Sequence, residues 1–307
     1  MFLNLIESLL RSGLKLAAPL WLTATGETYA ERAGLINIGL EGMMLTGAFA
    51  GMAVSYFTGN PWLGLLAGML AGIALAALFG ILTIYFYADQ IITGAALNLV
   101  ALGLTGFLFR SIFGVTGAAL TVASFPLVDI PVLKEIPFCG AFLSGQPILL
   151  YLALGVIPLA SFVLNRTALG LAIRACGEYP AATDTAGLNV FRLRLGCILF
   201  CGMLTGAAGA YLTLAHANTF VEGITAGRGF IALAIVIFGR WQPWGVLFAA
   251  LFFGCANALQ FQFQALGYDV PYQFFLMLPY LLTLLVLLIS TSSGHGPAAL
   301  GKAYKRN

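Results

Sequence analysis

Five polar side chains lie close together near the start of an otherwise apolar chain: Glu27, Glu31, Arg32, Asn37 and Glu41. Glu27 and Glu31 are one helical turn apart, and so are Asn37 and Glu41. An ionised carboxylate that faces lipid costs at least about 2.5 kcal/mol, so we expect Glu41 to face a helix bundle or a wet cavity. Such a group could line a substrate path or carry a proton. It could also clamp helices together, with Arg32 paired to a glutamate or with carboxylates capping broken helices, and we weigh these structural roles above the others.

Two single amides, Asn98 and Asn257, stand within apolar segments. Side chains of this kind commonly hydrogen-bond to a neighbouring helix, and both are also candidates for the lining of a path. The histidines, His216 and His295, are too isolated to hold a metal ion, and the spacing of the five cysteines matches no zinc or iron–sulfur site. The chain therefore offers no catalytic set and no cofactor site of its own.

The polar interval 166–194 carries four arginines and interrupts the apolar sequence. Pro180 can occupy the first turn of a short helix, because its missing N–H would be unpaired there anyway. Ala182 and Ala186 fall on one helical face, and Gly187 can end the helix. A short helix with small side chains is suited to docking into a groove on another protein, although an ordinary connector between spans is an equal alternative.

The composition identifies the chain as a polytopic α-helical membrane protein. Charged residues make up 8% and hydrophobic residues 61% of 307 residues, against roughly 25% and 45–50% in soluble domains. Apolar runs recur at lengths that span a bilayer. We predict a helical bundle of about nine spans (eight to ten), at about 3–25, 36–57, 62–87, 91–112, 147–165, 195–215, 229–239, 243–263 and 272–291.

Basic residues predict the orientation of these spans. The interval 166–194 and the C-terminal tail hold four and three of the 14 basic residues and are placed in the cytoplasm, with Arg240 beside them. The loop 113–146 then lies outside, and nine spans put the N-terminus outside as well. The 30–72 and 224–254 segments resemble each other and enter from opposite sides, which is the pattern of an inverted repeat in transporters.

Small residues at fourfold spacing predict where spans cross closely. One set is Gly64, Gly68 and Gly72, and the other is Gly202, Gly206 and Ala210. Small side chains at this spacing allow two helix backbones to approach each other.

Several motifs are absent from the sequence, namely a phosphate-binding loop of the G-x-x-x-x-G-K-[ST] type, a zincin signature and a G-x-S-x-G elbow. The net charge of +3 is small and gives no indication of nucleic-acid binding. If the protein moves a substrate actively, the energy comes from another subunit.

Residues 26–51 and 171–212 together resemble permease subunits of bacterial ATP-binding cassette (ABC) importers, in the superfamily that handles ribose, nucleosides and branched-chain amino acids. The nucleoside and simple-sugar subgroup is the most similar. The resemblance implies that residues 1–307 form one permease domain in the bacterial inner membrane. It also implies that a cytoplasmic coupling helix docks on an ATPase subunit, with Gly177, Glu178, Pro180, Ala182, Ala186, Gly187 and Asn189 matching. Here Pro180 replaces the usual Glu of the EAA pattern, and Gly187 comes one residue late.

The resemblance further implies that Asn37, Gly39, Glu41 and Gly42 belong to a central helix bordering the pathway. ATP and Mg²⁺ would be bound by the separate ATPase. The other expected partners are a second, non-identical permease, an extracytoplasmic binding protein and membrane lipid. The expected substrate is a nucleoside or a related purine or pyrimidine compound, with a simple sugar such as a pentose as the alternative. A proton-coupled secondary transporter using Glu41 is the alternative from another class, and a membrane-embedded enzyme is the least favoured.

Overall fold

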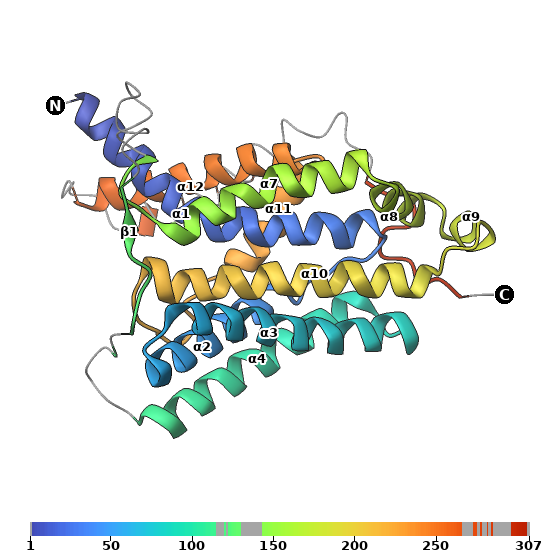
Figure 1. Ribbon diagram of the computed structural model, residues 1–307, viewed down its shortest axis with the longest axis horizontal. Coiled ribbons are helices and arrows are strands. Elements are labelled where there is room, and N and C mark those ends of the chain that lie inside the picture. The colour runs from blue at the N-terminus through green and yellow to red at the C-terminus, as the bar shows by residue number, and fades with distance from the viewer. Residues whose placement is uncertain are drawn as a thin grey trace.

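The computed structural model describes residues 2–114, 120, 122–129, 143–265 and 296–305, together with five residues between 273 and 284. These residues form a bundle of helices, elongated along the helix axes (Figure 1). The helices are α1 (Phe2–Arg32), α2 (Leu40–Thr58), α3 (Pro61–Gly80), α4 (Gln90–Phe113), α7 (Ile148–Arg166), α8 (Ala168–Glu178), α9 (Pro180–Thr185), α10 (Val190–Tyr211), α11 (Arg228–Phe238) and α12 (Pro243–Ala265).

Two helices continue into a π-helical turn, α3 into η1 (Ile81–Tyr85) and α10 into η2 (Leu212–His216). The strands β1 (Leu127–Val128) and β2 (Gln146–Pro147) form one short antiparallel pair. We call the end of the bundle that carries α8 and α9 the α9 end, and the other the opposite end (Figure 1). The strand pair lies at the opposite end, where the backbone N–H of Phe125 donates to the Leu214 carbonyl at 2.9 Å.

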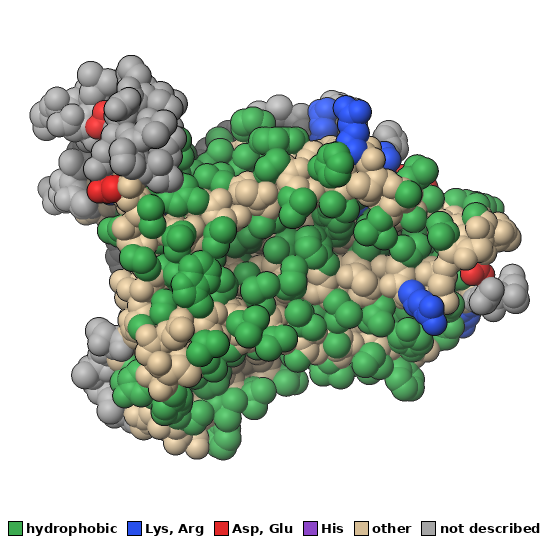
Figure 2. All heavy atoms as spheres, in the orientation of Figure 1, with side chains coloured by type: hydrophobic (Ala, Val, Ile, Leu, Met, Phe, Trp, Pro, Cys, Tyr) green, Lys and Arg blue, Asp and Glu red, His purple; other side chains and the backbone are tan. Residues whose placement is uncertain are grey.

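Five of the described helical segments are long and apolar enough to cross a membrane: 61–85, 90–113, 148–166, 190–216 and 243–264. They coincide with predicted spans to within a few residues, and α11 is a shorter apolar helix at the predicted position. The hydrophobic side chains that cover the middle of the visible face, with Lys and Arg side chains near the α9 end, fit this placement in lipid (Figure 2). The count of nine is supported only roughly, since the predicted span at 272–291 lies largely outside the described residues.

The first two predicted spans need correction. Helix α1 does not end near residue 25 but runs without interruption to Arg32, so Glu27 and Glu31 lie on a continuous helix. Helix α2 begins at Leu40 and not at 36, and the residues between the two helices are non-helical. Inside the bundle, Glu27 is fully buried and Glu31 is 4% exposed. The polar side chains of residues 27–31 therefore lie on the part of α1 that other helices enclose.

The polar interval 166–194 is also more regular than predicted. It contains the short helix α9 starting at Pro180, as expected, and Gly187 adopts the positive φ of +86° that ends it. It also contains α8, an amphipathic helix that the sequence did not indicate.

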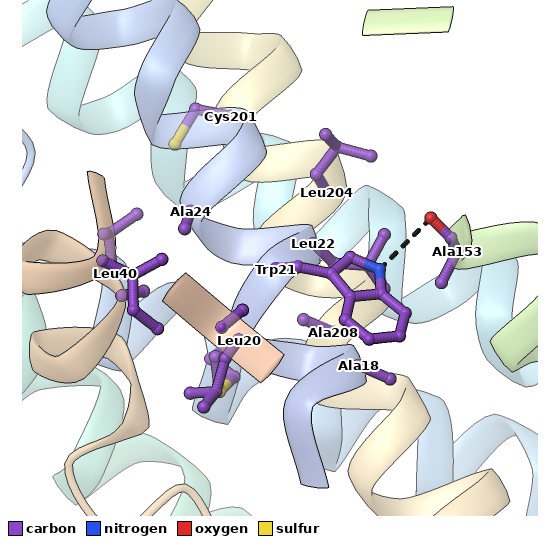
Figure 3. Close-up of a cluster of buried hydrophobic side chains, with 14 of the residues drawn as sticks. Ala18, Leu20, Trp21, Leu22, Ala24, Leu40, Ala153, Cys201, Leu204 and Ala208 are labelled. Atoms are coloured by element: carbon purple, nitrogen blue, oxygen red, sulfur yellow. Dashed lines mark hydrogen bonds between the residues drawn. The ribbon is translucent and has the colours of Figure 1, made fainter. Parts of the chain in front are cut away.

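The core forms around α1, which packs against α10, α12, α11 and α7. Trp21 of α1 is fully buried, and its indole Nε1 donates to the Ala153 carbonyl of α7 at 3.2 Å (Figure 3). Ala18, Leu22, Leu204 and neighbouring side chains surround the ring. A buried indole needs such an acceptor, so Trp21 fixes α7 along α1 as well as filling space.

Glycines bring α3 and α10 into the close contact that their spacing predicted. A Cβ on Gly206 would overlap the Gly68 carbonyl oxygen, and one on Gly72 would overlap the Gly202 carbonyl oxygen. The two backbones therefore touch, which maximises dispersion contacts where no hydrophobic effect drives helices together in lipid.

We predict that Gly206→Val lowers the stability of the purified protein by about 1–3 kcal/mol, because the crossing has no room for a side chain. Gly196→Val is the matched control on the same helix, since a Cβ there meets nothing within 4 Å. The measurement is the temperature at which each variant loses monodisperse elution in detergent. If both variants lost monodisperse elution at the same temperature, the close contact of α3 and α10 at Gly206 would be contradicted.

Candidate functional site

The break between α1 and α2 is held by a buried carboxylate and a buried amide. The backbone N–H of Asn37 donates to Oε1 of Glu27 at 2.8 Å, and the Cys201 thiol donates to Oε2 of the same carboxylate at 3.3 Å. Asn37 Oδ1 in turn accepts from the backbone N–H of Gly39 at 3.0 Å. Because buried backbone groups need partners, these side chains make a non-helical segment tolerable inside the bundle.

Glu41, in the first turn of α2, caps a second helix. Its Oε1 accepts from the hydroxyl of Thr225 at 2.6 Å and from the backbone N–H of Gly227 at 2.8 Å. Its Oε2 accepts from the backbone N–H of Gly229 at 2.7 Å. Gly227 and Gly229 flank the first residue of α11, so the carboxylate satisfies orphan N–H groups and opposes the positive end of the helix dipole.

The starts of α2 and α11 touch at this point. A Cβ on Gly229 would overlap the backbone nitrogen of Glu41, so only glycine permits the approach. From Glu41, α2 runs to the opposite end, where Ser55 donates its hydroxyl to the Ala123 carbonyl at 2.8 Å. Helix α11 runs to the α9 end, where the following turn meets Arg32. Two broken helices that diverge from one point fit the predicted inverted repeat.

Helix α4 clamps the break from the other side. Asn98 donates through Nδ2 to the Ile38 carbonyl at 2.9 Å, and its Oδ1 accepts from the Gly42 backbone N–H at 2.8 Å. At the start of α4, Gln90 Oε1 accepts from the backbone N–H of Ile36 at 2.8 Å. Asn98 therefore hydrogen-bonds between helices, as predicted for a single amide in an apolar span, and its side chain is half-buried.

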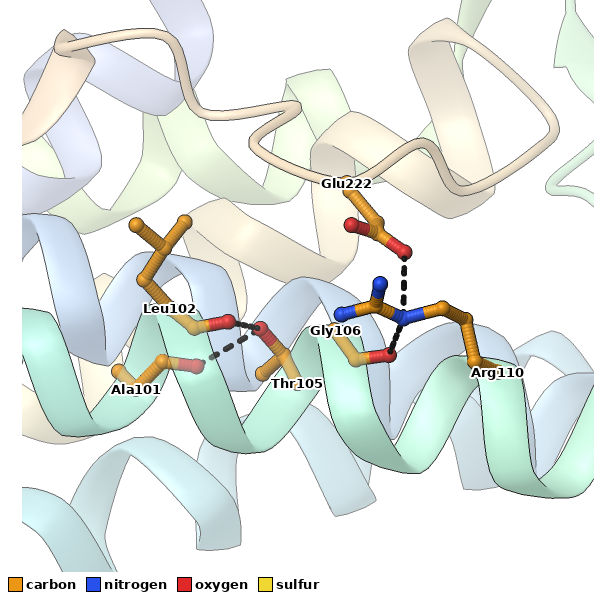
Figure 4. Close-up of polar contacts among 6 residues, drawn as sticks. All are labelled: Ala101, Leu102, Thr105, Gly106, Arg110 and Glu222. Carbon is orange, nitrogen blue, oxygen red and sulfur yellow. Dashed lines mark hydrogen bonds and ion pairs between the residues drawn. The ribbon is translucent and has the colours of Figure 1, made fainter.

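The loop before α11 is also tied to α4. Glu222 forms an ion pair with Arg110, Oε1 to Nε at 3.4 Å, and Arg110 Nε also donates to the Gly106 carbonyl (Figure 4). The Arg110 and Glu222 side chains are 60% and 46% exposed. The pair lies further along α4 than Asn98, so Glu41, Asn98 and the Arg110–Glu222 pair are polar positions spread over the surface formed by α4, α2 and the start of α11. We call this the polar face.

Glu31 and Arg32 have structural roles, but not the mutual pairing that the sequence allowed. Glu31 Oε2 accepts from the indole Nε1 of Trp241, and Arg32 Nε donates to the Trp241 carbonyl at 3.0 Å. Both residues therefore fasten the α11–α12 turn to the end of α1.

The predicted pathway residues fall into different environments. Asn37 is fully buried and holds the break, whereas Glu41 and Asn98 are half-buried at the polar face. Asn257 is half-buried on α12. Their roles in a pathway stay predictions.

The predicted coupling residues divide in a similar way. Glu178, Ala182, Ala186, Gly187 and Asn189 are exposed, and Pro180 is half-buried. Asn189 caps α10 by accepting from the Arg192 backbone N–H at 3.0 Å.

Gly177 does not belong to that exposed set. It is buried under the end of α1, where a Cβ would overlap the Arg32 carbonyl oxygen. Cys176 beside it donates its thiol to the Ala33 carbonyl at 3.6 Å, and burial raises the pKa of the Cys176 thiol, which keeps it a donor.

Sequence reasoning missed three features of this region. Thr225 and Gly229 had no signal of their own, because their importance depends on where Glu41 lies. Arg194 was counted as a loop residue, although it is 3% exposed within α10. Within the described residues no group of His, Cys, Asp and Glu could hold a metal ion.

Comparison with known proteins shows that the chain belongs to a known family. Residues 9–287 match the family described as "Branched-chain amino acid transport system / permease component". The chain is 38% identical to the guanosine ABC transporter permease protein NupQ of Bacillus subtilis, over 98% of this chain and 97% of the relative. It is 34% identical to the nucleoside ABC transporter permease protein NupC of Lactococcus lactis, over 98% of both.

A third relative, named as a candidate glucose ABC transporter permease protein (TsgC13) of Haloferax volcanii, is 39% identical over 86% of this chain and 80% of its own length. The relatives come in pairs. Permeases with the same substrate in their names, NupP of Bacillus subtilis and NupB of Lactococcus lactis, are 28% identical to this chain over 77% and 78% of its length. No solved structure matches significantly.

We predict that Glu41→Gln destabilises the start of α11 by about 1–3 kcal/mol, because an amide nitrogen cannot accept from the Gly229 or Gly227 N–H. The melting temperature of the purified protein reports the loss.

Glu222→Gln is the matched control, because a half-exposed ion pair contributes only about 0–1 kcal/mol. A larger loss for Glu222→Gln than for Glu41→Gln would contradict the capping role.

Proposed function

Because the chain belongs to the permease-component family of branched-chain amino acid transport systems, whose members are membrane subunits without an ATPase site of their own, we propose that it is the permease of a bacterial ABC importer for nucleosides. The importer lies in the inner membrane, and a separate subunit hydrolyses ATP. The observation that carries the substrate class is similarity over 98% of the chain to two permeases named for guanosine and for nucleosides.

The chemistry of the polar face agrees with a nucleoside. A nucleoside is polar and uncharged, with hydroxyl groups and a planar base. The polar face carries the Asn98 amide, the single hydroxyl group of Thr46 and the capped carboxylate of Glu41. Its charges are paired or capped, so it suits a neutral substrate better than an ion.

A simple sugar is the second candidate substrate. It is favoured by the 39% identity to the candidate glucose permease of Haloferax volcanii. A pentose or glucose is also neutral and rich in hydroxyl groups, so the same surface would accept it. The nucleoside ranks first because the similarity to the nucleoside permeases extends over more of both chains.

A proton-coupled transporter using Glu41 is disfavoured by the geometry. The Glu41 carboxylate accepts three hydrogen bonds, from Thr225, Gly227 and Gly229. All three contacts hold the carboxylate at the start of α11, so the geometry gives Glu41 a capping role between two helices.

Helix α9 has the exposure that an ATPase docking helix needs. Ala182 and Ala186 are exposed, and Tyr179 and Leu188 at its two ends are 68% and 43% exposed. Beside α9 lies an apolar groove of about 710 Å³ lined by residues of α8, α9 and α10. Small side chains let the helix backbone enter a groove of the ATPase, and the flanking apolar side chains would be covered by it.

A second permease would complete the path. The polar face includes half-exposed charged and amide groups beside the strongly apolar outer face of α4, where Ile92 and Leu99 are 71% and 72% exposed. Such groups are costly against lipid, so they call for a water-filled space shared with another subunit. The paired relatives support a non-identical partner, and an extracytoplasmic binding protein would deliver substrate to the opposite end.

We predict that deleting this chain from its cell reduces uptake of radiolabelled guanosine to background, and that a plasmid copy restores it. Uptake should depend on ATP and persist when the proton gradient is collapsed. Unchanged guanosine uptake with a fall in glucose or pentose uptake would assign the sugar as substrate instead.

We predict that Ala182→Phe abolishes co-purification with the ATPase, because a large side chain on exposed α9 prevents its entry into a groove without disturbing the bundle. Ala217→Phe is the control, an exposed alanine at the opposite end. Undiminished ATPase recovery with Ala182→Phe would show that α9 is not the docking helix.

A further inference from the structure

The described C-terminal residues 296–305, which we call the C-terminal strap, cross the α9 end between α8, α9 and α10 (Figure 1). The strap begins against the Trp241 ring, on which Gly296 packs, and ends with the Lys305 ammonium 5.3 Å from the centre of the Tyr87 ring. It therefore touches elements that lie far apart in the sequence.

The strap is hydrogen-bonded to the helices next to the docking surface. The Ala299 backbone N–H donates to the Gly177 carbonyl at 2.9 Å, and the Ala298 N–H donates to Glu178 Oε2 at 3.3 Å. Tyr304 donates its hydroxyl to Asp184 Oδ2 of α9 at 3.1 Å. A movement of α9 would therefore displace the strap through the hydrogen bond between Tyr304 and Asp184.

The strap is equally tied to the break between α1 and α2. The Gly301 backbone N–H donates to the Gly34 carbonyl at 3.1 Å. Gly34 precedes the segment that Glu27 and Asn37 hold, so the strap reaches the same non-helical stretch from which α2 and Glu41 start.

Arg194 joins the strap to that stretch. Its Nε donates to the Ala33 carbonyl at 3.1 Å, and its Nη1 donates to the Lys302 carbonyl at 3.0 Å. The residue is 3% exposed, and its guanidinium also interacts with the Cys176 side chain of α8. A guanidinium buried this deeply depends on the carbonyls that it bonds, so Arg194 fixes Ala33 and Lys302 relative to α10.

We propose that the C-terminal strap transmits the movement of α9 to the break between α1 and α2, with Arg194 as the positioning residue. The inference rests on the proposed ABC function, because it needs an ATPase that moves α9. When α9 shifts, Tyr304 and Ala299 carry the strap with it. Arg194 then transfers the displacement to Ala33 and so to the start of α2 at the polar face.

The test uses the complete importer in liposomes, with both permeases, the ATPase and the binding protein. Two quantities are measured, ATP hydrolysis stimulated by guanosine-loaded binding protein and guanosine transported per ATP hydrolysed. For Arg194→Met we expect the complex to be recovered in normal amounts. We expect the guanosine transported per ATP hydrolysed to fall about tenfold, which is within the range of allosteric couplings.

Arg192→Met is the matched control, an exposed arginine on the same helix. It should transport like wild type. If Arg194→Met transports as much guanosine per ATP as wild type, the inference is overturned. It is also overturned if Arg192→Met lowers transport per ATP as much as Arg194→Met does.

If Arg194→Met does not assemble, Tyr304→Phe decides the matter. It removes only the hydroxyl that bonds Asp184, and we expect transport per ATP to fall about threefold with assembly intact. Unchanged transport per ATP in Tyr304→Phe overturns the inference about the strap. A wild-type complex that neither hydrolyses ATP nor transports guanosine would instead contradict the proposed function.

Discussion

The interaction on which the arrangement depends is the one between the Glu41 carboxylate and the start of α11. Lipid offers no hydrogen bonds, so a helix that begins inside a membrane must have its first N–H groups satisfied by protein. Glu41 does this for Gly227 and Gly229, and Glu27 and Asn37 do the same for the segment before α2. Without these groups the N–H groups at the start of α11 and in the segment before α2 would be left unsatisfied inside the bundle.

This constraint also places the polar residues on one side. A carboxylate that caps a helix start is half-exposed at the surface formed by α2, α4 and α11, next to Asn98 and the Arg110–Glu222 pair. Large hydrophobic side chains are exposed along α3, α4 and α7, where they suit lipid. Among the described residues the polar face is therefore a surface that needs water or a partner, and the proposed permease pair would supply both.

The glycine contacts explain why the break can lie so close to the rest of the bundle. Gly229 lets α11 approach the backbone of Glu41, and Gly209 lets α10 approach the Met44 carbonyl of α2. From α10, Cys201 reaches Glu27 and Arg194 reaches Ala33. The same helix therefore supports the break at its middle and at the α9 end.

The sequence by itself determined the class of the protein, most span positions, the short helix at Pro180 and the glycine crossing, because these follow from local hydropathy, proline and glycine chemistry. It also identified Glu41 as a carboxylate that faces the bundle or a wet cavity, and Asn98 as a candidate for an interhelical hydrogen bond. Only the tertiary structure decided that α1 continues to Arg32, that Glu41 caps α11, and that Arg194 and the C-terminal strap meet the end of α1. Those features join residues as far apart as Glu41 and Gly229, or Ala33 and Lys302, through Arg194. A carboxylate or guanidinium shows in the sequence that it needs partners, but which distant backbone groups supply them depends on how the helices pack.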